Sequence, residues 1–225
     1  MDLHTFSIAA YHPGEDSFGI AVATARPTVG NLVPFVNAHG AIATQARVNT
    51  DIGRQGLALL KAGVALDVAL NALLQADDEP ARRQVHGVTR DAHFAFTGDL
   101  CVPWAGHHLG EHFTVAGNML AGEQVIAAMA VAFSDAVTAG HELSRALIAA
   151  LTAGQEAGGD KRGKQSAALL VVSPNPRMYH NLRVDEHVDP VPELCRIYDL
   201  VVEQSRQIER EYGAEGLRLF SRIKV

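Results

Sequence analysis

The order of the strand-like and helix-like segments constrains the fold of this chain most strongly. Segments in which bulky apolar residues alternate with small or polar ones come in groups, and two amphipathic segments follow each of the first two groups. Strict alternation of single strands and single helices would predict a parallel, doubly wound sheet. Paired strands followed by paired helices instead predict an α+β fold, in which antiparallel sheets are sandwiched between layers of helices.

Hydrophobic periodicity places the individual elements along the chain. Strands are expected at residues 5–11, 17–24, 41–46, 84–88, 93–97, 112–118, 167–172 and 179–184. Helices are expected after an N-cap at Asp51, at 66–74, 122–137 and 142–155, and after Asp189-Pro190, which has the chemistry of a helix start. The turn residues at 12–16 join the first two strands into a hairpin. Residues 26–37 and 99–110 are expected to be irregular.

A polar loop at residues 158–166 precedes the apolar run at 167–172. It contains Gly158, Gly159 and Gly163, together with residues of both charges. Glycine permits close approach of backbones and positive φ angles. The unbroken apolar run predicts a strand that is buried on both faces. A charged loop at the mouth of a buried strand is a typical position for a functional site, although a solvated turn after a helix explains the same residues.

Composition limits the classes of function. The chain has 225 residues, of which 48% are hydrophobic, and a formal net charge of −6. We expect one domain over residues 1–225, with a C-terminal helix and tail at 190–225 that packs against a partner subunit in a homo-oligomer. The net negative charge predicts no nucleic-acid partner. The sequence shows neither a signal peptide nor a membrane-spanning run, so we expect a cytoplasmic protein with no membrane partner, whose Cys101 and Cys195 are free thiols.

Standard motifs for cofactors and metals are missing from the sequence. It contains no phosphate-binding GxxxxGK[ST], no GxGxxG after a strand, no GxSxG and no HExxH, so no cofactor is expected. His107, His108 and His112 cluster in sequence, but neighbouring side chains in an extended chain face apart. No metal is therefore expected, and a metalloenzyme built on these histidines is kept as a third hypothesis.

Two further residues have more than one interpretation. Trp104 is the only tryptophan, and it either lines a pocket or anchors the core. Cys101 lacks a partner pattern of the kind that activates a nucleophile, so an inert, buried thiol is expected.

Several short motifs together resemble a known family. The motifs lie at residues 5–8, 43–46, 95–98, 103–107, 115–120, 158–172 and 182–187. Their order along the chain resembles that in the domain-of-unknown-function family 1028. The resemblance extends from Thr5 to about Leu200. It implies the fold of the N-terminal-nucleophile hydrolases, a four-layer αββα sandwich of two mainly antiparallel sheets.

The resemblance also implies a mechanism, which is hydrolysis or transfer at an amide bond of a small or peptide-like substrate. The nucleophile would be the Thr5 hydroxyl, with the residue's own α-amine as base. Asn118 and the backbone near Gln45 would donate hydrogen bonds to the oxyanion, while Asp160 and Ser166 would orient the nucleophile. The implied substrate contacts are Thr44, Gln45, Trp104, Lys161 and Arg162, of which Lys161 or Arg162 would alternatively lower the pKa of the amine.

The start of the chain departs from the family pattern. Family members commonly begin Met-Thr-Phe-Ser, whereas residues 1–4 here are Met-Asp-Leu-His. The nitrogen of an unprocessed Thr5 is an amide and cannot act as a base. The sequence leaves open self-cleavage before Thr5, a mis-assigned start, and a catalytically silent protein that serves as a binding or assembly module. For an active enzyme we expect Asp160→Asn to abolish turnover with little change in thermal stability.

Overall fold

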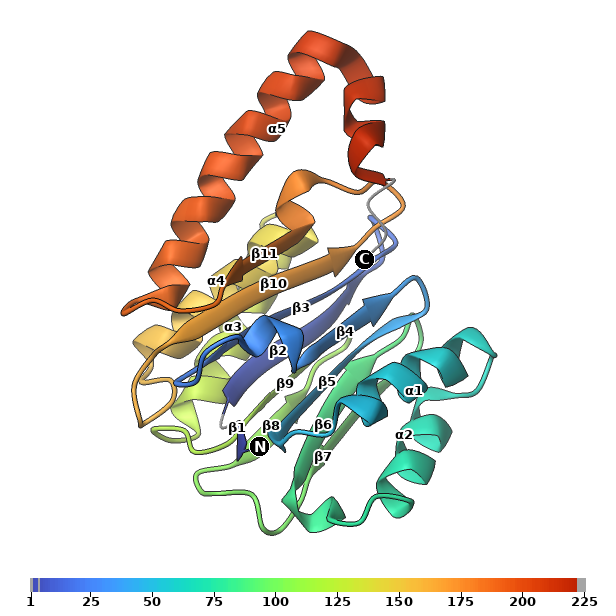
Figure 1. The fold of residues 1–225 in the computed structure, drawn as a ribbon, viewed down its shortest axis with the longest axis vertical. Helices are drawn as coiled ribbons and strands as arrows, with labels where there is room; N and C mark the ends of the chain where they lie inside the picture. Colours follow the sequence, from blue (N-terminus) through green and yellow to red (C-terminus); the bar gives the residue numbers. More distant parts are fainter. Residues whose placement is uncertain (1, 4, 222–225) are drawn as a thin grey trace.

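The computed structural model describes residues 2–3 and 5–221, with side chains for residues 5–213. Two antiparallel sheets lie face to face, and helices cover the outer face of each sheet (Figure 1). This order of layers confirms the predicted α+β sandwich. No helix in the described part of the chain is both long enough and apolar enough to cross a bilayer.

The larger sheet has six strands in the order β11-β10-β3-β2-β9-β8. Its strands are β2 (Thr5–His12), β3 (Ser17–Thr24), β8 (Gly106–Leu109), β9 (Phe113–Gly117), β10 (Ser166–Val172) and β11 (Asn181–Val184). The smaller sheet has the order β1-β5-β6-β7, and β4 also pairs with β5. Its strands are β1 (Asp2–Leu3), β4 (Pro34–Asn37), β5 (Gly40–Arg47), β6 (Arg83–Val88) and β7 (His93–Thr97).

Helices pack on the two outer faces. The smaller sheet is covered by α1 (Thr50–Lys61) and α2 (Leu66–Gln75), and the larger sheet by α3 (Gln124–Thr138) and α4 (Leu143–Glu156). The last helix, α5 (Pro190–Ser221), starts against the larger sheet and then extends beyond it (Figure 1). Short 3-10 turns occur at η1 (Val29–Asn31), η2 (Pro80–Arg82) and η3 (Met178–His180).

Three strands were not predicted from the sequence. β4 lies within the segment expected to be irregular, and β8 lies within the expected loop at 99–110. β1 is two residues long. All three are short, so none has enough residues for a clear period of two, and pairing with longer strands defines them. The α1 cap also differs from the prediction, because the Asn49 side chain accepts a hydrogen bond from Asp51 N at 3.0 Å.

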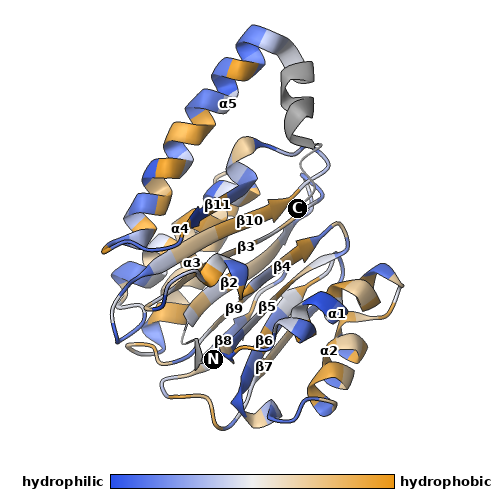
Figure 2. Ribbon diagram, in the orientation of Figure 1, coloured by the Kyte–Doolittle hydropathy of each residue, from blue (hydrophilic) through white to orange (hydrophobic). Residues whose placement is uncertain are grey.

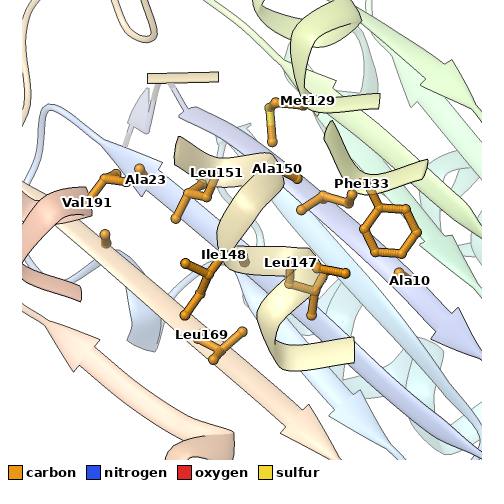
Figure 3. Close-up of a cluster of buried hydrophobic side chains, with 14 of the residues drawn as sticks. Ala10, Ala23, Met129, Phe133, Leu147, Ile148, Ala150, Leu151, Leu169 and Val191 are labelled. Carbon is orange, nitrogen blue, oxygen red and sulfur yellow. The ribbon is translucent and has the colours of Figure 1, made fainter. Parts of the chain in front are cut away.

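The core divides into three layers. Under α3 and α4, Phe6 and Ile8 of β2 share a buried cluster with helix residues such as Met129 and Leu147. Figure 3 labels these two helix residues within the cluster. Successive β2 residues point to opposite faces, so Ala9 lies between the two sheets with Ala43 of β5. A third cluster packs α1 and α2 against the smaller sheet. At one end of the sandwich the positions between the sheets carry polar side chains instead.

α5 shows the amphipathic pattern expected of it. Polar and apolar residues alternate along it in Figure 2, and Val191, Leu194, Tyr198 and Val202 join the core under α4. The backbone leaves helical geometry at Gly213, where φ is 63°. The helix begins at Pro190 as predicted, and the Asp189 carboxylate accepts a hydrogen bond from the Lys164 ammonium group.

Candidate functional site

Three hydroxyl side chains form a row across one end of the larger sheet. Thr5 is opposite Thr24 in the pairing of β2 with β3, and Thr24 is opposite Ser166 in the pairing of β3 with β10. All three residues are buried. Opposed residues in an antiparallel pair point to the same face, and here that face is the one turned toward the smaller sheet. The structure therefore places the predicted residues Thr5 and Ser166 on one face of the sheet, with Thr24 between them.

Asn118 lies beside Thr5, at the end of β9. Its backbone N–H donates to the Thr5 carbonyl oxygen at 3.0 Å. Its side-chain Nδ2 donates to Oε1 of Gln84, also at 3.0 Å. The side chain of Asn118 is thus directed into the space between the sheets, next to the start of β2. Asn118 was predicted as a catalytic residue, and the structure places it in contact with the predicted nucleophile.

Asp160 reaches the same end of the sandwich from the loop between α4 and β10. Its Oδ2 accepts from Ala25 N at 3.2 Å and from Nη2 of Arg162 at 2.6 Å. Its Oδ1 accepts from the backbone N of Arg162 at 2.9 Å and from Nε of Arg162 at 3.0 Å. A bridge between Asp160 and Leu120 joins this loop to the segment after Asn118. The carboxylate is thus held next to Thr24, the neighbour of Thr5.

Ser166 anchors the chain that leaves β3. Its Oγ donates to the Arg26 carbonyl at 2.6 Å and accepts from Val29 N at 3.1 Å. These two bonds use the hydroxyl proton and one lone pair, so Ser166 holds the segment after β3 against the start of β10.

The side chains of Thr44 and Gln45 point in opposite directions from β5. Thr44 Oγ1 donates to the Asn49 carbonyl at 3.2 Å, on the side of α1. Gln45 faces the larger sheet, where its Oε1 accepts from Ser7 at 2.6 Å and its Nε2 donates to Gln84 at 2.8 Å. Only Gln45 of this pair therefore lies on the face shared with Thr5.

The two predicted cations in the 158–166 loop differ in their surroundings. Lys161 is exposed, and its backbone N donates to the Met119 carbonyl at 3.1 Å. The Arg162 guanidinium is bound to Asp160 and is 24% exposed. An exposed ammonium group is available to an incoming molecule, whereas the Arg162 charge already has a buried partner.

Trp104 serves both roles that the sequence left open. Its indole packs beside Gly106 against the core under α3 and α4. It also lines a pocket of about 590 Å³ together with Asp99, Cys101 and His107. The Trp104 carbonyl accepts from Leu120 N at 3.0 Å, which ties the pocket wall to the segment after Asn118. Cys101 is buried, and burial raises the pKa of its thiol.

The predicted histidine cluster is spread over separate contacts. His107 Nδ1 lies 2.9 Å from the Thr97 hydroxyl, His108 packs against Phe113, and His112 meets the edge of Tyr11. Within residues 2–3 and 5–221, no three His, Cys, Asp or Glu side chains are grouped so that they could hold a metal ion.

A buried polar network between the sheets was missed by the sequence analysis. Ser7 Oγ lies 2.7 Å from Nε2 of His86, and Nδ1 of His86 lies 2.8 Å from the Thr114 hydroxyl. Burial, with a smaller contribution from His107, lowers the pKa of His86 to about 3, so the imidazole is neutral at pH 7. The available signal was the polar residues at strand positions that face the partner sheet, such as Ser7, Gln45, Gln84 and His86.

Unusual backbone angles gather near Thr5. Among the described residues, the non-glycine residues with positive φ are Asp16, Thr28, Ala46 and Met119. Ala46 follows Gln45, Met119 follows Asn118, and Thr28 precedes the Val29 N–H that binds Ser166. Left-handed backbone angles are unfavourable for residues with a Cβ and are enriched at functional sites. Three of the four therefore support this end of the sandwich as the functional one.

Comparison with known proteins agrees with this assignment of the fold. The model of a family described as "Family of unknown function (DUF1028)" matches residues 5–194. The crystal structure of protein SPO2555 from Silicibacter pomeroyi, of the same family, superimposes with a TM-score of 0.81 at 32% sequence identity, covering 91% of each chain. The curated proteins include no match. With most of its length matched by the family model, the chain belongs to the DUF1028 family.

Proposed function

We propose that this protein is an amidohydrolase of the N-terminal-nucleophile type that acts on a small amide or peptide-like substrate. One observation supports the proposal most directly. Thr5, Asn118, Asp160 and Ser166 come from four separate segments of the chain and meet at one end of the larger sheet. A hydroxyl at a strand start, amide donors and a nearby carboxylate are the parts needed for acyl transfer.

The proposed reaction proceeds in two steps. The free α-amine of Thr5 takes the proton of its own hydroxyl while Oγ1 attacks the substrate carbonyl. The tetrahedral oxyanion receives hydrogen bonds from Asn118 and from the backbone near Gln45. The C–N bond then breaks, the leaving amine takes the proton, and the acyl group remains as an ester on Oγ1. Water hydrolyses this ester, releases the acid and restores Thr5.

The reaction requires cleavage of the peptide bond before Thr5. Leu3 pairs with Ala46 in the smaller sheet, whereas Thr5 pairs with Thr24 in the larger one, so the chain passes from one sheet to the other between them. His4, at the proposed cleavage point, lies outside the described residues. The Lys161 ammonium group, exposed beside this end of the sandwich, is the proposed contact for a negatively charged part of the substrate.

A second candidate function is a catalytically silent binding or assembly protein. Asp2 and Leu3 have paired positions on β5, and the Asp160 carboxylate is bound by Arg162 and Ala25. The pairing on β5 favours a protein that keeps the residues before Thr5, and a carboxylate already bound by Arg162 favours a silent scaffold. The cytoplasmic location and the homo-oligomeric state inferred from the sequence stay predictions under either function.

Intact-mass analysis of the purified full-length protein distinguishes the two functions. A chain that begins at Thr5 supports the hydrolase, and a chain that retains the residues before it supports the silent protein.

Reactivity of the hydroxyl gives a second test. A variant in which Met1 is followed directly by Thr5 exposes the threonine after removal of methionine. We expect it to release p-nitrophenolate from p-nitrophenyl acetate in a burst and to carry one acetyl group on the Thr5 oxygen. Thr5→Val, which keeps the shape and the amine but removes the hydroxyl, is the matched control. Equal bursts from both proteins would exclude Thr5 as the nucleophile. If Thr5 alone accounts for the burst, the unmodified variant with a free Thr5 would be screened for turnover of amide-bearing metabolites.

A further inference from the structure

Gln84 has hydrogen-bond contacts at both ends of its side-chain amide in the space between the two sheets. It is fully buried in β6. Its Nε2 lies 2.9 Å from the Thr97 hydroxyl, 2.9 Å from the Gly117 carbonyl oxygen and 3.1 Å from the Gly106 carbonyl oxygen, which are three acceptors for its two protons. Its Oε1 accepts from Nε2 of Gln45 at 2.8 Å and from Nδ2 of Asn118 at 3.0 Å. Both amide side chains of the candidate site therefore end on one oxygen atom.

The backbone determines which way the Gln84 amide points. Carbonyl oxygens only accept hydrogen bonds, so the end of Gln84 that faces Gly106 and Gly117 must be the NH₂ group. The oxygen end then faces Gln45 and Asn118, and both of these residues must present their NH₂ groups to it. Turning the Gln84 amide over would place its oxygen against the carbonyl oxygens of Gly106 and Gly117 and would bring three NH₂ groups together.

The direction of the hydrogen bonds at Gln84 also determines their direction through Gln45 and Ser7 to His86. Because Gln45 gives its NH₂ group to Gln84, its oxygen accepts the single proton of the Ser7 hydroxyl. Nε2 of His86 must therefore carry a proton and donate to Ser7, and Nδ1 accepts from the Thr114 hydroxyl. A general base would instead need an unprotonated nitrogen facing the serine. Ser7 and His86 thus belong to the support of the site and do not form a nucleophile–base pair.

We propose that Gln84 is the positioning residue of the candidate site, because its amide sets the orientation of the Asn118 and Gln45 side chains next to Thr5. The importance of this orientation for a reaction rests on the proposed function, whereas the direction of the hydrogen bonds does not. A residue that only holds the two sheets together would tolerate any orientation of the side-chain amides in which each polar atom has a hydrogen-bond partner. A positioning residue requires this arrangement.

The substitution Gln84→Glu in the full-length chain tests the arrangement through pH. A protonated carboxyl group keeps one accepting oxygen for Gln45 and Asn118 and one donor for the carbonyls of Gly106 or Gly117. A carboxylate has no donor and places negative charge against those carbonyls. Burial and the facing carbonyls therefore raise the folded-state pKa of the introduced group above the unfolded value of about 4.3.

The sign of the expected pH dependence follows from this raised pKa. The stability of the variant should come closest to that of the parent protein below about pH 4. Relative to the parent, its unfolding equilibrium constant should then rise about tenfold per pH unit until the folded-state pKa is passed. We expect an increase of at least about a hundredfold by pH 7, equivalent to a shift of two pKa units. The measurement is urea unfolding followed by circular dichroism.

Gln55→Glu on the exposed face of α1 is the matched control, since it adds the same charge in solvent. The titratable groups that face Gln84 are His86 on the same strand and His107 across Thr97, and the Arg83–Asp77 ion pair lies beside them on the neighbouring position of β6. They are shared by both variants, so the difference between the variants isolates the introduced carboxyl group. An identical pH response of the two variants would overturn the assignment.

The side-chain amide of Asn118 reports positioning directly. Its two Nδ2 proton resonances, identified by their loss in Asn118→Asp, should move in Gln84→Glu at pH 7 and return toward the parent positions near pH 4. Resonances that do not move while the protein is destabilised would show that Gln84 only holds the two sheets together and refute positioning. If the variant in which Met1 directly precedes Thr5 fails to react with p-nitrophenyl acetate, the proposed function fails, but these two measurements still decide the role of Gln84.

Discussion

Replacing Asp160 with Asn is predicted to destabilise the protein measurably. Four hydrogen bonds converge on the carboxylate, two on each oxygen, and three of them come from Arg162. An asparagine side chain has one accepting oxygen, so its NH₂ group must face two donors whichever way it turns. This geometry changes the expectation from the sequence, in which Asp160→Asn leaves stability nearly unaltered.

The magnitude follows from the exposure of the two partners. The Asp160 side chain is 0% exposed and that of Arg162 is 24% exposed. Removing one partner of a buried ion pair costs about 3–5 kcal/mol. Because the Arg162 guanidinium can regain part of its hydration, we expect a loss of about 2–3 kcal/mol in the free energy of unfolding.

The pair formed by Arg183 and Asp185 supplies the control. Its nitrogen and oxygen atoms lie 2.7 Å apart, but the side chains are 31% and 48% exposed. Exposed pairs contribute at most about 1 kcal/mol, so Asp185→Asn should have a small effect. Urea unfolding followed by far-UV circular dichroism measures both variants. Equal losses for Asp160→Asn and Asp185→Asn would refute the argument that burial and donor convergence make the Asp160 pair strong.

Two other predictions concern pH and packing. The pKa of His86 is lowered to about 3 by burial, well below its unfolded value of about 6.5, so its contribution to stability is complete above pH 6.5 and is lost as pH falls toward 3. His86→Gln should flatten the fall in the free energy of unfolding between pH 6.5 and 5, to which His86 contributes about 2 kcal/mol. The pKa of His180 is lowered to about 4, so its contribution to stability is also lost as pH falls, but this histidine is present in both proteins. Leu147→Ala, at a fully buried position of α4, should lower the free energy of chemical unfolding by about 2–5 kcal/mol. Val131→Ala, on the exposed face of α3, should lower it by less than about 1 kcal/mol. Similar losses for the two variants would contradict the packing in Figure 3.

Local periodicity was sufficient to predict most of the elements. The alternation at 5–11 and 17–24 and the intervening turn predicted the hairpin of β2 and β3, and the helix pairs were found from their apolar stripes. These patterns depend only on neighbours in sequence, because side-chain direction repeats every two residues in a strand and about every 3.6 in a helix. Short strands such as β4 and β8 were not predicted, because they are defined by pairing with neighbouring strands rather than by a pattern in their own sequence.

The candidate site was predicted in part. The family resemblance indicated Thr5, Asn118, Asp160 and Ser166, and the structure places them at one end of the sandwich. Their partners were not predictable, since the sequence suggested that Asp160 orients the nucleophile, whereas its carboxylate accepts hydrogen bonds from Arg162 and Ala25. A loop residue's partner depends on where the loop folds back, and local pattern does not encode that.

By itself, the amino-acid sequence determined which residues of a strand share a face, because strand alternation is a property of the local chain. Only the tertiary structure decided which of these residues meet. Ser7 and His86 are 79 positions apart, and Gln84 and Asn118 are 34 apart. Their contacts arise because the two sheets stack in one register, and buried polar groups need partners across the interface, since water is excluded there.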